Sequence, residues 1–94
     1  MRAVAIRLNT DGTADPVLLE KDEGRLLLQL RELVGGDLEV LPLDEAYMVL
    51  NERGKTAPHS LNREATDIAH EAHVLAPGDY IAGAAVIVPA AAML

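Results

Sequence analysis

The chain has 94 residues, half of them apolar, a formal net charge of -7 and no cysteine. This length fits one domain that buries roughly 60 to 65% of its unfolded surface, which is compatible with a homodimer without requiring one. The acidic charge argues against the basic stripe that direct nucleic-acid binding needs. The lack of cysteine excludes disulfides and Cys-ligated zinc, and it fits a cytoplasmic protein.

The two most apolar stretches are too short for targeting or membrane insertion. Residues 3–6 are apolar, but Arg7 ends that run before it reaches the length of a signal peptide. Residues 81–94 fall short of the roughly 20 that span a bilayer, and Gly83 and Pro89 interrupt them. We therefore expect neither a signal peptide nor a membrane partner.

The first half of the chain predicts a hairpin followed by a helix. Residues 3–8 and 17–19 have the composition of strands, and the turn residues 9–12 lie between them. From Gly24 onward, apolar residues recur on one helical stripe, namely Leu26, Leu27, Leu30, Leu33 and Val34. Gly35-Gly36 predicts the end of this helix, because glycine adopts the left-handed conformation that closes a helix.

The second half predicts another hairpin, a helix and a final strand. Residues 38–41 and 47–50 form the hairpin, and Pro42 marks the end of a strand or an edge. The helix follows a loop, with a stripe of Leu61, Ala65, Ile68, Ala69 and Ala72. Residues 80–88 form a nearly all-apolar strand, suited to the middle of a sheet, and residues 90–94 an alanine-rich tail.

These elements predict one compact α+β domain over residues 1–94. The order is ββαββαβ, with a mainly antiparallel sheet and two helices packed on one face.

Gly54-Lys55-Thr56 resembles the end of a phosphate-binding loop. That loop requires a glycine where Val49 stands and a helix afterwards, which Ala57-Pro58 disfavours. The sequence favours a hairpin turn in which Gly54 supplies a positive φ.

Residues 70–73, His-Glu-Ala-His, resemble a zinc-binding helix with one residue missing. Asp67 lies one turn earlier and would extend a partial ligand set, but three polar residues on a charged helical face are more often a solvated surface. Other isolated candidates lack partners: the carboxylates Glu39, Asp44 and Glu45, and the neighbours His59 and Ser60. We assign no metal, no cofactor and no catalytic residue.

The strongest polar constellation spans a hairpin turn and the start of the second helix. Free N–H groups at a helix start, together with two basic side chains, suit an anionic group or a carboxylate of a partner. Capping by Ser60 or Asn62 and ordinary turn chemistry is the favoured alternative. The candidate ligand- or partner-binding residues are Asn51, Glu52, Lys55, Asn62, Arg63 and Thr66.

Four segments of the chain form a recognisable series: residues 34–39 (Val-Gly-Gly-Asp-Leu-Glu), 51–55 (Asn-Glu-Arg-Gly-Lys), 62–66 (Asn-Arg-Glu-Ala-Thr) and 79–83 (Asp-Tyr-Ile-Ala-Gly). Together they resemble the domain of unknown function numbered 3846, a family of small proteins from bacteria, bacteriophages and other mobile elements. The resemblance implies a compact intracellular α+β domain encoded by a phage or plasmid, and it supplies no reaction. Residues 67–73 and the tail beyond Pro89 depart from the family pattern.

Three functions follow as expectations. The first is a non-enzymatic accessory domain that binds a host protein, favoured by small size, acidity and the lack of an assembled catalytic set. The second is a small-ligand or nucleotide-binding module that uses the polar turn and helix start. The third is an enzyme or metal site at Asp67, His70 and His73.

Overall fold

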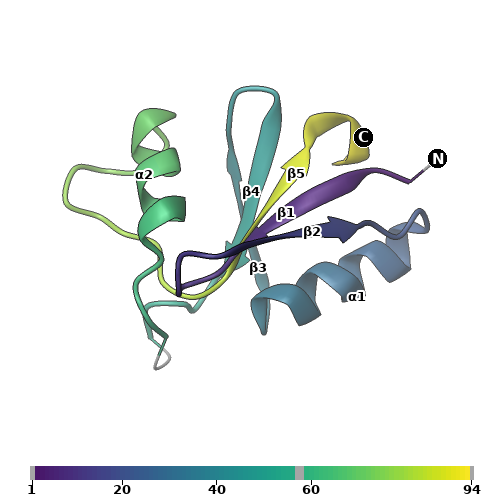
Figure 1. Ribbon diagram of the computed structural model, residues 1–94, viewed down its shortest axis with the longest axis horizontal. Coiled ribbons are helices and arrows are strands. Elements are labelled where there is room, and N and C mark those ends of the chain that lie inside the picture. Colours follow the sequence, from purple (N-terminus) through teal and green to yellow (C-terminus); the bar gives the residue numbers. More distant parts are fainter. Residues whose placement is uncertain (1, 57–58, 94) are drawn as a thin grey trace.

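The computed structural model describes residues 2–56 and 59–93, and its elements follow the predicted order ββαββαβ (Figure 1). A short 3-10 helix, η1, comes last. The elements are β1 (Val4–Leu8), β2 (Ala14–Leu18), α1 (Glu23–Val34), β3 (Leu38–Pro42), β4 (Ala46–Asn51), α2 (Arg63–Glu71), β5 (Ala85–Pro89) and η1 (Ala90–Met93). Within the described residues, no helix is both long enough and apolar enough to cross a membrane.

The five strands of the described residues form one antiparallel sheet in the order β2-β1-β5-β4-β3. Each predicted hairpin is present, and β5 lies between them, pairing with β1 on one side and β4 on the other. The α+β class, the element order and the central position of the last strand are therefore confirmed. β3 lies at an edge and ends at Pro42, as that proline predicted.

Helix α1 begins at Glu23, one residue before the predicted apolar stripe region, and ends at the predicted glycine stop. The side chain of Asp22 accepts a hydrogen bond from the backbone N–H of Arg25, which caps the start of the helix. At the other end, Gly35 has a φ of 81° and donates its N–H to the carbonyl of Arg31. The chain thus leaves the helix directly into β3.

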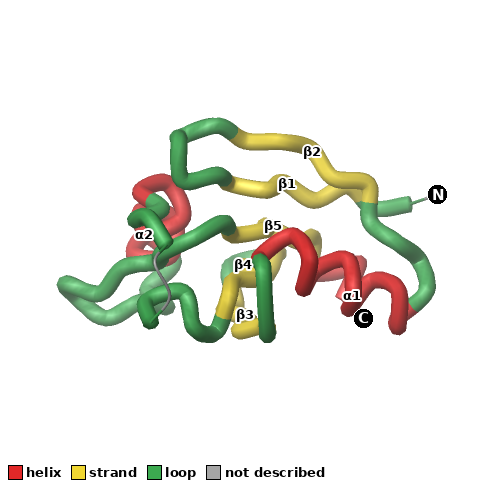
Figure 2. Tube along the Cα trace, turned by 90° about the horizontal axis from the view of Figure 1, so that it is seen from below, coloured by secondary structure: helices red, strands yellow, loops and turns green. Residues whose placement is uncertain are grey.

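The expectation that both helices pack on one face of the sheet does not hold. Neighbouring residues of β4 and β5 point to opposite faces, and both faces carry apolar side chains that must be covered. One core contains α1 and is formed by Ala5, Leu19, Leu30, Val34, Val49, Val86 and Val88. The other contains α2 and is formed by Leu8, Met48, Leu50, Ala65, Ala69, Ile81 and Ala85. Figure 2 shows the two helices well apart.

Two boundaries in the second half differ from the prediction. Leu61 precedes α2 and is 53% exposed, and it forms an isolated bridge with Ala82. The last strand begins at Ala85, because Gly83 adopts a φ of 83° that extended backbone does not allow. Of the predicted tail, Ala90–Met93 form η1 and Ala92 packs against the α1 core, while residue 94 lies outside the described residues.

Candidate functional site

A pocket of about 250 Å³ lies between the turn after β4 and the segment before β5. The predicted site residues Asn51, Glu52 and Lys55 line it, together with Glu39 and Tyr80. The other three candidates, Asn62, Arg63 and Thr66, do not. The structure therefore brings half of the predicted set around one cavity.

Asn51 is buried and holds the turn in place through its side-chain amide. Its Oδ1 accepts a hydrogen bond of 2.8 Å from the N–H of Arg53, and its Nδ2 donates one of 3.2 Å to the carbonyl of Val34 at the end of α1. A Cβ on Gly36 would lie 2.9 Å from this Nδ2, so the glycine makes room for the amide. Both polar groups of Asn51 are used within the fold.

Gly54 has a role different from the predicted one. Its φ is not among the positive φ values of the described glycines, which belong to Gly12, Gly35, Gly78 and Gly83. A Cβ on Gly54 would instead lie 2.6 Å from the backbone carbonyl oxygen of Ala82. Gly54 is required because two backbones meet here at close range.

Asn62 is fully buried and caps the start of α2. The sequence predicts either Ser60 or Asn62 for this cap. Its Oδ1 accepts a hydrogen bond from the N–H of Ala65, and its Nδ2 donates to the carbonyls of Leu8 and Gly83 at 3.0 and 2.9 Å. The hydroxyl of Thr66 donates to the carbonyl of Asn62 and accepts from the N–H of Ile81. These two side chains therefore join the helix to β1 and to the segment before β5.

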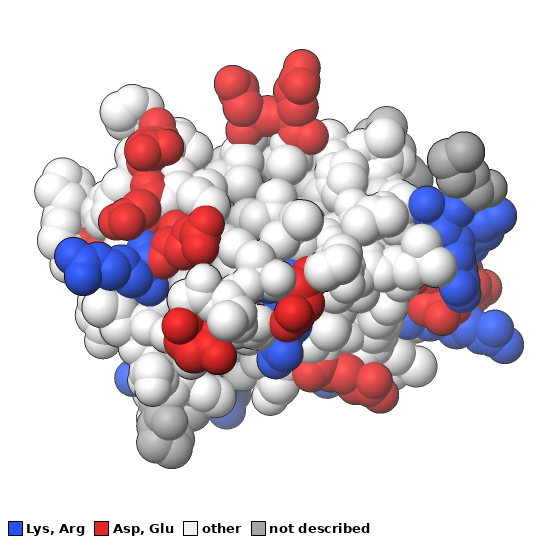
Figure 3. Space-filling model, in the orientation of Figure 1, with Lys and Arg blue, Asp and Glu red and all other residues white. Residues whose placement is uncertain are grey.

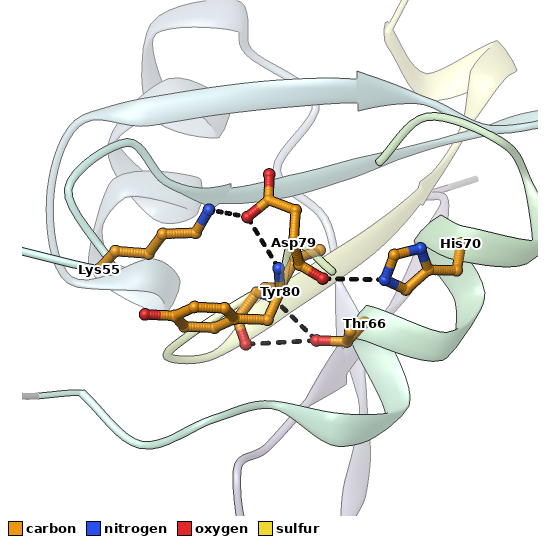
Figure 4. Close-up of polar contacts among 6 residues, drawn as sticks. Lys55, Thr66, His70, Asp79 and Tyr80 are labelled. Carbon is orange, nitrogen blue, oxygen red and sulfur yellow. Dashed lines mark hydrogen bonds and ion pairs between the residues drawn. The ribbon is translucent and has the colours of Figure 1, made fainter. Parts of the chain in front are cut away.

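Three members of the predicted set are exposed, namely Glu52, Arg63 and Lys55. Glu52 lies in the turn after β4, and Arg63 is the first residue of α2. Lys55 forms an ion pair with Asp79, and its ammonium lies 4.9 Å from the centroid of the Tyr80 ring (Figure 4). The basic group at the pocket is thus already engaged by a carboxylate and an aromatic face.

Asp79 and Tyr80 are site residues that the candidate set omitted. Asp79 also accepts a hydrogen bond of 2.8 Å from the N–H of Tyr80, and its own carbonyl lies 2.8 Å from Nε2 of His70 (Figure 4). The available signal was composition, since Tyr80 is one of two aromatic residues in the chain. Both residues also belong to the last of the four segments that carry the family resemblance.

The ion pair makes stability depend on pH. The pKa of Asp79 lies below its ordinary value of 3.8, because Lys55 donates a hydrogen bond to the carboxylate and the N–H of Tyr80 donates another. A carboxyl group whose pKa is lowered by folding adds stability above 3.8 and loses it as the pH falls through the folded value. We expect Asp79→Asn to melt at a lower temperature than the wild type at about pH 7, and the difference to vanish at about pH 2. An equal difference at both pH values would contradict this.

Asp67, His70 and His73, the residues of the third alternative function, are not arranged as a metal site. Among the described residues, no group of three His, Asp, Glu or Cys side chains is placed to hold a metal ion. His70 is turned toward the carbonyl of Asp79, and His73 has a φ of 59°. The N–H groups of His73 and Val74 bond the carbonyls of His70 and Ala69, which closes the helix as a glycine commonly does. The pair is used to end α2.

The family model of the domain of unknown function DUF3846 matches residues 1–92. The chain belongs to this family. No curated protein and no solved structure matches the chain.

In this DUF3846 domain, the four signature segments meet in space around the turn. Gly36 makes room for Asn51, Gly54 makes room for the carbonyl of Ala82, and Asn62 bonds the carbonyl of Gly83. Each contact joins a residue of one segment to a residue of another. In this chain, several residues of the four segments that carry the resemblance are therefore used in packing and hydrogen-bond contacts within the fold.

Proposed function

We propose that this chain is a non-enzymatic interaction domain of phage or other mobile-element origin that binds a host protein in the cytoplasm. The origin is what the family resemblance of the four segments implies, and the absence of cysteine is compatible with a reducing compartment. The observation that carries the binding function is an exposed apolar surface beside α1.

This surface, here called the α1–β3 groove, is a cavity of about 280 Å³ between α1, β3 and η1. Leu27, Val40 and Met93 line it and are 50%, 41% and 36% exposed, and the neighbouring Leu28 is 61% exposed. Large apolar side chains that gather around a hollow are typical of a protein-binding surface. The polar turn and helix start have fewer groups available for a partner, because the side-chain amides of Asn51 and Asn62 bond the protein's own backbone.

The charge of the molecule indicates what kind of protein would bind. Carboxylate side chains lie at the tip of the β3–β4 hairpin, and basic side chains cluster at the end of the molecule near the N-terminus (Figure 3). Glu23 lies in the groove and Glu39 is exposed on β3. A partner with an apolar contact and a basic residue placed to meet Glu23 or Glu39 is complementary to the groove and its neighbouring strand.

Charge reversal in the groove tests the function. We expect the wild type, tagged at either terminus, to capture one discrete protein from a lysate of the bacterial host. Leu27→Glu with Leu28→Glu should reduce capture about tenfold or more, because charges then enter the apolar contact. Leu61→Glu is the matched control, since Leu61 is 53% exposed but lies beside α2. The absence of a discrete partner, or equal capture by all three proteins, would overturn the proposal.

A second candidate is a small-ligand module, and the pocket at the polar turn favours it. A small anion would compete with Asp79 for Lys55 and would lie near Glu39 and Glu52, so the pocket suits a neutral molecule that stacks on Tyr80 better. Native mass spectrometry of gently purified protein tests this candidate. A small molecule that co-purifies with the wild type but not with Tyr80→Ala would support this candidate. If no small molecule co-purifies and no metabolite in a panel changes the melting temperature, this candidate is wrong.

A further inference from the structure

The two edges of the sheet differ in the backbone groups that they present. Along β2, the bonds from Asn9 N to Thr13 O and from Leu19 N to Ala3 O fix which residues face β1. Because pairing alternates along an antiparallel ladder, the residues that face outward are Ala14, Pro16 and Leu18. Proline has no N–H, so the centre of this edge cannot donate to a further strand. The β2 edge is closed.

The β3 edge is open over its central residues. The bonds from Leu43 N to Ala46 O and from Glu52 N to Asp37 O fix the phase of this ladder, so Glu39 and Leu41 face β4. The backbone N–H and carbonyl groups of Leu38 and Val40 therefore point away from the sheet. In the described part of the chain, β3 has β4 as its strand neighbour and none on its other side. Pro42 closes the far end only.

The α1–β3 groove lies alongside this open edge. The two residues with outward backbone groups, Leu38 and Val40, also line the groove with their side chains. Val40 pairs with Val49, which belongs to the α1 core, so its side chain is on the α1 side of the sheet. A strand added at this edge would point every second side chain toward the groove and the others toward the side of Glu39.

We propose that an extended segment of the partner protein adds to β3 as a sixth strand, with apolar side chains in the α1–β3 groove and a basic residue beside Glu39. Backbone hydrogen bonds supply affinity in this mode of recognition, and the groove and Glu39 supply specificity. The inference rests on the proposed binding function and specifies how the partner is held.

The charges on β3 select a different protein over a second copy of this chain. A symmetric pairing of two β3 edges that keeps every outward hydrogen bond sets Leu38 against Val40 of the second copy. That register places Glu39 directly opposite Glu39 of the second copy, a like-charge contact between two chains of net charge -7. A shift by two residues in one direction sets Leu38 against Pro42, which has no N–H, and a shift in the other direction sets Asp37 against Glu39. A basic strand from a different protein avoids both like-charge contacts and the pairing with Pro42.

Selection from a displayed library of random peptides of about 12 residues, longer than an ordinary strand, tests the proposal. Val40→Pro removes one outward N–H at an edge position that tolerates proline. Two variants are controls: Val40→Thr keeps the N–H and the branched shape, and Ala14→Pro places proline on the already closed β2 edge.

We expect all three variants to fold and to melt within about 5 °C of the wild type. Selected peptides should alternate apolar and basic residues and bind Val40→Pro at least about tenfold more weakly than the other proteins.

Hydrogen exchange and charge reversal give readouts that do not depend on the proline variant. A selected peptide should slow exchange of the Leu38 and Val40 amides, and N-methylation of its backbone should abolish binding. Glu39→Lys should shift the selection from basic to acidic residues. The proposal is overturned if no peptide is enriched, if Val40→Pro binds as well as Val40→Thr, or if neither amide is protected.

The two proposals can fail separately. Loss of the captured host protein in the Leu27→Glu, Leu28→Glu variant but not in Val40→Pro would leave the interaction domain standing and remove strand addition. Peptides that bind through the β3 edge without any captured host protein would leave the edge as a binding site and remove the proposed host partner.

Discussion

Gly54→Ala is expected to lower the free energy of unfolding by about 3 kcal/mol or more, a large share of the roughly 5 to 14 kcal/mol that a domain of this length has. The added Cβ would lie 2.6 Å from the carbonyl oxygen of Ala82, which is backbone and cannot rotate away. The segment before β5 would have to move, and with it the bridge between Leu61 and Ala82. Urea unfolding followed by circular dichroism measures the loss.

Gly78→Ala is the matched control for this substitution. Gly78 has a φ of 83°, and among the described residues no heavy atom would lie within 4 Å of a Cβ added there, so alanine meets backbone strain without a clash. We expect a loss of about 1 to 2 kcal/mol. If both variants unfold at the same urea concentration, close packing is not the reason for a glycine at position 54.

Asn62→Ala is expected to cost about 3 to 5 kcal/mol, because it removes a helix cap and two buried hydrogen-bond donors together. The N–H of Ala65 loses its acceptor, and the carbonyls of Leu8 and Gly83 lose the amide that bonds them. Asn62 is 0% exposed, so water does not replace these bonds without opening the core. Thermal and urea unfolding should both report the loss.

Two further substitutions separate the parts of this effect. Asn62→Ser restores an oxygen that caps α2 but not the donors to the carbonyls, so it should recover about 1 kcal/mol relative to alanine. Asn9→Ala removes an asparagine whose bonds to Thr13 and Asp15 are exposed, and it should cost less than about 1 kcal/mol. A cost for Asn62→Ala no larger than that for Asn9→Ala would contradict the structural role.

The local elements were predictable because their causes lie within a few residues. The stop at Gly35, the strand end at Pro42 and both hairpins depend on turn chemistry and backbone restrictions at those positions. The central place of β5 followed from its continuous apolar run. The same apolar run is also evidence against two helices on one face, because a strand that is apolar on both sides must be covered on both faces of the sheet.

The candidate site was less predictable because its causes lie far apart in sequence. Lys55 meets Asp79 across 24 positions, and Gly54 is required by the carbonyl of Ala82. An asparagine that satisfies the chain's own backbone looks the same in sequence as one that is available for a ligand. The sequence therefore predicts Asn51 and Asn62 as candidate binding residues, whereas in the structure their side-chain amides bond the protein's own backbone.

The position of β5 sets the order in which the sheet can be built during synthesis. Its two neighbours, β1 and β4, belong to separate hairpins, and in the described part of the chain these hairpins are joined only through β5. Until residues 85–89 have been made, the central place between the two hairpins cannot be filled. Pairings so distant in sequence also slow folding, because a long loop must close before they form. Completion of the sheet is therefore a late event, one in which exposed strand edges are available to chaperones or to misassembly.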